Sequence, residues 1–260
     1  MNKDLLKKLT PYLIALGTFI LIAIIYCSPI LEGKVLQAGD TLSWKGMYQE
    51  NKAYTENTGE HTFWTGSMFS GMPNYQIGGG EISSTTALQP ISKLTRMFSN
   101  GPLQLILTYL IGFFILLRSF KLDKWLALIG AIAIAFSSYF FIIIEAGHIT
   151  KAVTIGLMAP IIGGFFLIFN KKYVWGVIFT LIYSAIALLP HVQMTYYFFM
   201  LIGCLFFAEL FIHIKEKRFK DLVLGIVLFV AAVGIGFGTQ FTKMQLNKEY
   251  VTETDRKSVV

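Results

Sequence analysis

A single carboxylate near the start of a long polar segment is the first side chain suited to chemistry. Asp40 stands in Ala38-Gly39-Asp40-Thr41, about ten residues past an apolar run that ends at position 30. The polar segment 31–100 is enclosed by long apolar runs, so we expect the function of the chain to lie there. Asp40 is either a catalytic carboxylate or the N-cap of a following helix, where aspartate is favoured. Spacing alone favours the N-cap.

A second group of ionisable residues follows a later apolar run. Glu145, His148 and Lys151 are spaced by three, which places their side chains on neighbouring faces if a helical turn persists. A carboxylate, an imidazole and an ammonium grouped in this way can bind a phosphate or share a proton. The alternative, which stays open, is that they only solvate a short turn. His191, in the next turn on the same side, is by itself typical of a polar turn residue.

Other catalytic patterns are missing from the sequence. It contains no Ser–His–Asp arrangement, Cys-x-x-Cys or His-Glu-x-x-His motif, so nothing supports a hydrolase or a zinc enzyme. The glycine run 78–80 lacks the lysine and the following helix of a phosphate-binding loop, which argues against nucleotide binding. Glu209 and His213 lie one helical turn apart beside a basic loop, where an ion pair or snorkelling explains them.

The elements that position these residues are long apolar segments. Hydrophobic residues make up 55% of the 260 positions and charged residues only 14%, well below the charged share of a soluble domain. Several runs approach or exceed the length that crosses a bilayer core. The sequence therefore predicts an all-α integral membrane protein with about seven transmembrane helices. These spans run over approximately 11–30, 102–118, 125–144, 152–169, 173–190, 194–214 and 222–238.

Basic residues predict the orientation of these spans. The net charge of +7 does not indicate nucleic-acid binding, because the basic residues cluster in short loops between apolar runs. The positive-inside rule makes the side that carries them cytoplasmic. We expect a multi-pass protein of the bacterial cytoplasmic membrane, with a cytoplasmic N-terminus, a large extracytoplasmic loop 31–101 and an extracytoplasmic polar tail 239–260. Twelve of the 22 Lys and Arg residues lie on the predicted cytoplasmic side: Lys3, Lys7, Lys8, Arg118, Lys121, Lys124, Lys171, Lys172, Lys215, Lys217, Arg218 and Lys220.

Two further features concern the packing of these segments. Aromatic and apolar residues recur at helical spacing over Thr41–Asn57, and Gly59 offers a stop, which predicts an amphipathic helix on the outer membrane surface. In the last span, four glycines are typical of close helix packing. These are Gly225, Gly234, Gly236 and Gly238.

Several motifs resemble the bacterial YfhO-type membrane proteins. They are Gly33-Lys34-Val35-Leu36-Gln37-Ala38-Gly39-Asp40 with Trp44-Lys45-Gly46-Met47, then Phe63-Trp64-Thr65-Gly66-Ser67-Met68-Phe69-Ser70-Gly71-Met72-Pro73, Ala146-Gly147-His148-Ile149-Thr150-Lys151, and His191-Val192-Gln193-Met194-Thr195-Tyr196-Tyr197. They occur in the order of that family and cover most of the chain. Ser70 departs from the pattern, which more often has glycine there.

The resemblance implies a fold and an activity. The YfhO-type family is similar to the GT-C glycosyltransferases, whose extracytoplasmic active site has an essential acid in the first outer loop and whose usual donor is a polyprenyl-phosphate sugar. It implies that Asp40 is a general base or metal ligand, with Glu145, His148, Lys151 and His191 as donor-phosphate contacts or their supports.

The implied chemistry requires that the Asp40 loop and the Glu145 turn meet at the membrane face. There the carboxylate would take the proton of an acceptor hydroxyl. Lys151, His148 or a bound divalent cation would stabilise the leaving phosphate. Trp64 and Phe69 are expected either to stack on a sugar or lipid head group or to serve as plain interfacial anchors.

Two expectations complete this interpretation. Members of the family continue with further spans, so the chain is expected to be an N-terminal portion that inserts but has little transferase activity alone. The alternative function is a non-enzymatic transport or envelope-assembly protein that binds lipid or polymer through its first outer loop. The low charge within the spans argues against an ion-coupled transporter.

Overall fold

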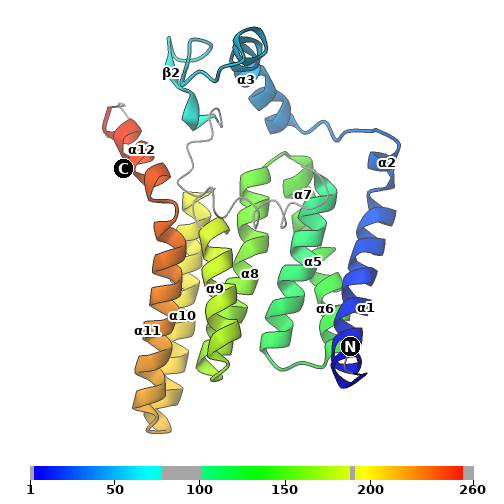
Figure 1. The fold of residues 1–260 in the computed structure, drawn as a ribbon, viewed down its shortest axis with the longest axis vertical. Helices are drawn as coiled ribbons and strands as arrows, with labels where there is room; N and C mark the ends of the chain where they lie inside the picture. Colours follow the sequence, from blue (N-terminus) through cyan, green and yellow to red (C-terminus); the bar gives the residue numbers. More distant parts are fainter. Residues whose placement is uncertain (1–2, 78–100, 188–190, 254–260) are drawn as a thin grey trace.

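Long apolar helices run side by side in one bundle and make up most of the chain (Figure 1). The computed structural model describes residues 3–77, 101–187 and 191–253. The bundle helices are α1 (Lys3–Tyr26), α5 (Pro102–Ser119), α6 (Lys124–Ala135), α7 (Ser138–Glu145), α8 (Ile149–Phe169), α9 (Tyr173–Ala187), α10 (Val192–Lys215) and α11 (Phe219–Gly238). The predicted all-α fold is confirmed. Parts of the predicted outer loop (78–100), the fifth span (188–190) and the tail (254–260) lie outside the described residues.

Among the described helices, five are long and apolar enough to cross a membrane: α1, α5, α8, α10 and α11. The bent pair of α6 and α7 makes a sixth if it counts as one span. Helix α9 is apolar but has only 15 residues within the described part of the chain. The structure is therefore that of a multi-pass helical membrane protein, and the predicted number of seven spans stays a prediction.

The first and third predicted spans differ from the structure in detail. Helix α1 ends at Tyr26 and a short helix, α2 (Ser28–Leu31), follows, because Pro29 cannot continue the hydrogen-bond ladder of α1. The span predicted over 125–144 is broken into α6 and α7, which are bent by 45°. The break lies at Phe136 and Ser137, where Ser137 leaves the helical conformation with φ of −69° and ψ of 146° and occupies the N-cap position of α7.

Helix α8 is the centre of the bundle. Within its most apolar window 72% is buried, against 17% for α10 at the periphery. One apolar cluster joins its first turns to α1, α5, α6 and α7, and a second joins its remaining turns to α9, α10 and α11. Glycines let the backbones approach: a Cβ at Gly164 would lie 2.8 Å from the carbonyl oxygen of Gly176 on α9.

The glycines predicted to pack α11 divide into two pairs. A Cβ at Gly236 would lie 2.2 Å from Ser184 Oγ, and one at Gly225 would lie 2.9 Å from the Phe169 ring. These two glycines serve close packing as predicted. For Gly234 and Gly238 the prediction is wrong, because an added Cβ there would meet open space.

Three short loops at one end of the bundle share one backbone motif. Lys121, Lys171 and Lys217 each stand two residues past the end of a helix and have φ of 63°, 63° and 56°. The amide of Lys171 donates to Ile168 O and that of Lys172 to Leu167 O, which is the hydrogen-bond pattern of a Schellman cap. These loops therefore turn tightly and project basic side chains.

The other end of the bundle carries the polar segments (Figure 1). They are α3 (Gly39–Thr58), the antiparallel pair β1 (Trp64–Thr65) and β2 (Met72–Pro73), the 3-10 turn η1 (Asn74–Gln76), and α12 (Phe241–Glu253). The predicted helix 41–57 and its stop are confirmed, since Gly59 caps α3 with φ of 74°. Its predicted position on a membrane surface stays a prediction. Within the predicted polar tail 239–260 the structure contains α12, a helix that the sequence analysis did not predict.

Candidate functional site

Asp40 does not cap its helix. Helix α3 begins at Gly39 after Ala38, which occupies the N-cap position, and the Asp40 carboxylate forms no capping hydrogen bond. Instead Asp40 Oδ2 lies 2.6 Å from His148 Nδ1. The N-cap interpretation is therefore wrong, because a partner distant in sequence binds this carboxylate. The predicted meeting of the Asp40 loop with the turn after α7 is confirmed.

The turn 146–148 has a shape that brings His148 to Asp40. Gly147 has φ of 86°, a conformation that side chains other than glycine rarely adopt, and it ends the helical path between α7 and α8. The Asp40 amide also donates to Ala146 O at 3.4 Å. The backbone of α3 thus rests directly on this turn, and the ion pair is a consequence of that contact.

The turn also separates two residues that the sequence grouped. Glu145 is the last residue of α7, before Gly147, and its exposed side chain makes no hydrogen bond or ion pair within the described ranges. The helical turn that would have aligned Glu145 with His148 does not persist. The structure therefore gives Glu145 no contact with Asp40 or His148, and its proposed role stays a prediction.

Lys151 and His191 face the same region as His148. His191 is the N-cap of α10, and its Nδ1 accepts a hydrogen bond from the Met194 amide at 3.4 Å. Partial burial lowers the pKa of His191, and the positive charges of Lys151 and His148 lower it further. Lys151 Nζ lies 5.6 Å from the centre of the Tyr139 ring. Lys151 and His148 thus lie close enough to His191 to affect its pKa, and His148 is the one of the three that the structure pairs with Asp40.

Glu50, which sequence analysis did not single out, fixes the Phe63–Pro73 motif. Its Oε2 accepts hydrogen bonds from Thr65 Oγ1 at 2.6 Å, the Gly66 amide at 2.9 Å and the Ser67 amide at 2.8 Å. These bonds, the Thr65 hydroxyl first, lower the pKa of Glu50, with partial desolvation opposing them. Glu50 therefore anchors the two-stranded hairpin as a carboxylate.

A buried pair of amides adds to this anchor. Asn51 and Asn74 are 1% and 2% exposed, and the Asn51 side-chain amide donates to Asn74 Oδ1. Asn74 in turn donates to Thr62 O at 2.8 Å. Buried asparagines are uncommon unless their hydrogen bonds are made. Asn51 follows Glu50 directly, yet the sequence contains no local signal for either long-range contact.

The aromatic residues of the hairpin are exposed, and their anchor on α3 is not Asp40. Trp64 and Phe69 are 58% and 80% exposed, and the Trp64 indole covers Gly71, where a Cβ would lie 2.8 Å from the ring. Their anchor, Glu50, is ten residues from Asp40 along α3, which at 1.5 Å per residue is about 15 Å. Among the described residues, no hydrogen bond or ion pair joins the predicted stacking residues to the predicted catalytic residue.

The residues beside Asp40 do not fit a divalent-cation site. Asp40 and His148 are two potential ligands, but within the described ranges no group of three or more His, Cys, Asp or Glu residues is placed to hold a metal ion. His191 already accepts a hydrogen bond through Nδ1.

Comparisons with known proteins returned no match: no protein-family model, curated protein or solved structure is similar to this chain. The resemblance to the YfhO-type family thus stays a prediction.

Proposed function

We propose that this protein acts as a GT-C-like membrane glycosyltransferase, which moves a sugar from a polyprenyl-phosphate donor to a cell-envelope acceptor. The observation that supports the proposal is the contact between Asp40 and His148, made where α3 meets the ends of the bundle helices. A lipid-linked sugar offers its reactive carbon at this level, because its phosphate lies at the membrane face.

The chemistry of the proposal follows from the two carboxylate oxygens. Oδ2 of Asp40 pairs with His148 Nδ1, and Oδ1 makes no hydrogen bond with any described residue. In the proposed reaction Oδ1 takes the proton of the acceptor hydroxyl as its oxygen bonds to the sugar carbon. The bond from that carbon to the phosphate oxygen breaks, and the phosphate leaves with the electron pair. Lys151 and His148 stabilise its charge.

The proposal includes the location of the reaction. The site lies at the end of the bundle opposite the three basic loops. The positive-inside rule makes the loops cytoplasmic and the end that carries the site extracytoplasmic. The N-terminus, at the basic end, is then cytoplasmic (Figure 1). A bacterial cytoplasmic membrane, where polyprenyl-phosphate sugars serve envelope assembly, is the proposed setting.

The test uses protein expressed from its native locus and a labelled polyprenyl-phosphate sugar with envelope acceptors. We expect Asp40→Asn to lower transfer by at least about 100-fold, the usual contribution of a positioned base. Glu60→Gln, which changes an exposed acid beyond the end of α3, is the matched control and should keep full activity. Full transfer by Asp40→Asn would contradict the catalytic role.

A second function is supported by the exposed hairpin. Trp64 and Phe69 are exposed and flank the residues that Glu50 binds, so they suit binding of a polymer or lipid without chemistry at Asp40. The same assay distinguishes the two functions. Saturable binding of the labelled donor or acceptor without turnover, abolished by Trp64→Ala and unaffected by Asp40→Asn, would favour a non-enzymatic binding protein.

A further inference from the structure

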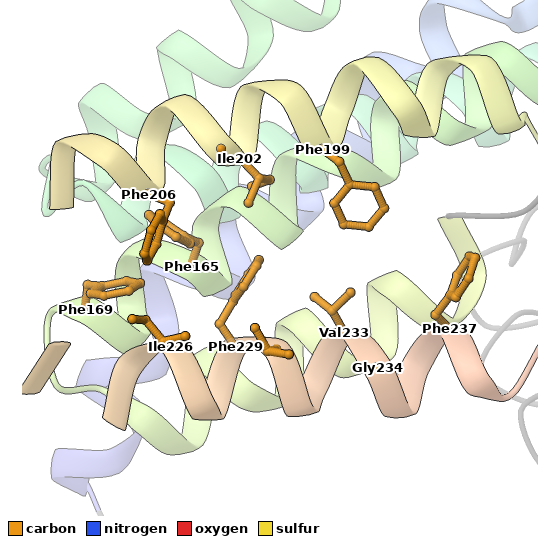
Figure 2. A pocket seen from close by; sticks show the side chains of 12 residues that line it. Phe165, Phe169, Phe199, Ile202, Phe206, Ile226, Phe229, Val233, Gly234 and Phe237 are labelled. Atoms are coloured by element: carbon orange, nitrogen blue, oxygen red, sulfur yellow. The ribbon is translucent and has the colours of Figure 1, made fainter. Parts of the chain in front are cut away.

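An apolar groove lies between the last two bundle helices. Figure 2 shows Phe199, Ile202 and Phe206 from α10 facing Phe229 and Val233 from α11 across an open space. Its volume is about 520 Å³, within the range of small-molecule sites. All of its lining residues are apolar, so the groove suits hydrocarbon.

The groove is elongated along the helix axes. It is lined on α11 from Ile226 to Phe237, which is about 16 Å of helix and roughly half of a bilayer core. Gly203 and Gly234 widen it, because an added Cβ at either position would meet open space. An extended hydrocarbon chain, rather than a compact ligand, matches this form.

One end of the groove meets two basic loops. Phe169, at the end of α8, lines the groove and its ring lies 5.6 Å from the His213 ring near the end of α10. The loops 170–172 and 216–218 follow directly. Lys171 is paired with Asp221 at 2.7 Å, and Arg218 is paired with Glu216.

These loops keep unpaired positive charge. Lys172, Lys215, Lys217 and Lys220 make no ion pair with any residue in the described part of the chain, and all four are exposed. A basic cluster at the level of a membrane surface attracts anionic lipid head groups. The groove therefore suits the hydrocarbon chain of a lipid, and the lysines suit the anionic head group of the same lipid.

We propose that the groove binds the acyl chain of an anionic phospholipid, whose phosphate lies against Lys172, Lys215, Lys217 and Lys220. The occupant belongs to the leaflet on the basic side of the protein, opposite Asp40. The site is thus separate from the proposed transferase site. We therefore expect a lipid to copurify with the protein, and we expect anionic lipids to bind in preference to neutral ones.

Native mass spectrometry of the full chain in detergent tests this. Phosphatidylglycerol and phosphatidylcholine with the same acyl chains are added in turn, and the retained one-lipid adduct is measured. We expect phosphatidylglycerol to be retained in preference. Lys217→Gln with Lys220→Gln should weaken its binding by about five-fold per lysine and leave phosphatidylcholine unchanged.

Two groove variants and one control separate the groove from the rest of the surface. Gly203→Leu and Gly234→Leu each place an apolar side chain at a groove-lining position where an added Cβ meets open space, and we expect both to reduce the adduct. Gly17→Leu makes the same change on α1, where an added Cβ also meets open space, and should have no effect. Helicity by circular dichroism shows that each variant is folded. Equal retention of the two lipids, or undiminished phosphatidylglycerol adduct in the folded groove variants, would overturn the proposal.

Discussion

Gly147 lies against Asp40 with no room for a side chain between them. A Cβ added at Gly147 would lie 3.2 Å from the Asp40 Cβ and 2.9 Å from the Ala38 Cβ. The absence of a Cβ thus lets α3 rest on the turn that carries His148. The proposed catalytic pair depends on this close approach.

Gly147→Ala should therefore separate α3 from the turn. The substitution adds the clash with Ala38 to a left-handed backbone cost of about 1–2 kcal/mol. We expect hydrogen exchange of the Asp40 amide, which donates to Ala146 O, to become faster. Gly33→Ala is the control, because Gly33 has φ of 77° and open space around it. Equal exchange at Asp40 in both variants would show that the contact is not needed.

Glu50→Gln should release the hairpin from α3. A neutral amide accepts more weakly than a carboxylate from Thr65 Oγ1 and the two backbone amides. We expect faster hydrogen exchange over 64–73, measured by mass spectrometry. Glu56→Gln removes an exposed charge on the same helix and serves as the control. Unchanged exchange in Glu50→Gln would contradict the anchoring role.

The same bonds predict a pH dependence of the unsubstituted hairpin. Because the pKa of Glu50 is lowered in the folded state, its contribution to stability is fully present above the unfolded pKa of about 4.3. It is lost as the pH falls through the lower, folded-state pKa. Exchange over 64–73 should thus accelerate only in acid below about pH 4.3. A change centred near neutral pH would point to another group.

Gly236→Ala should destabilise the packing of α11 on α9. The added methyl group would lie 2.2 Å from Ser184 Oγ and 2.8 Å from Leu181 O, so the helices must move apart. We expect a loss of about 1–3 kcal/mol, as for overpacking of a core. The measurement is the thermal unfolding of each variant. Gly238→Ala is the control and should leave the stability almost unchanged, because an added Cβ at Gly238 meets open space. Equal stability of the two variants would contradict the tight contact.

The orientation can be tested with cysteines in a Cys204→Ser background. Glu56→Cys on α3 should react with an impermeant thiol reagent in intact cells, and Lys172→Cys should react only after permeabilisation. Both side chains are exposed, and Cys27 is buried. The reverse labelling pattern would contradict the predicted orientation and would place the proposed active site on the cytoplasmic side.

Hydropathy predicted the helices well because burial in lipid requires long apolar runs that any sequence window reveals. It placed α5 to within one residue, at 102–118 against Pro102–Ser119. The break between α6 and α7 was not predicted, since Ser137 interrupts the backbone and leaves the mean hydropathy high. Helix α12 was missed because its sequence is polar.

The candidate site was predictable only in part, and for a physical reason. The expectation that the Asp40 loop meets the turn after α7 depended on which segments share one end of the bundle, and topology determines that. The role of Glu50 depends on hydrogen bonds to residues 15 to 17 positions away. Nothing in the residue types near Glu50 encodes those partners. For the same reason the sequence could not show that the hairpin is anchored at Glu50 rather than at Asp40.

The three lysines with left-handed backbone conformation destabilise the folded protein, whereas their positive charge has its effect during membrane insertion. Lys121, Lys171 and Lys217 occupy positions where glycine would be easier, at a cost of about 1–2 kcal/mol each in the finished fold. In the predicted orientation their charge acts earlier, when each pair of spans inserts into the bilayer and the basic loop between them is retained on one side. A glycine at these positions would then relax the folded protein and weaken the signal for its topology.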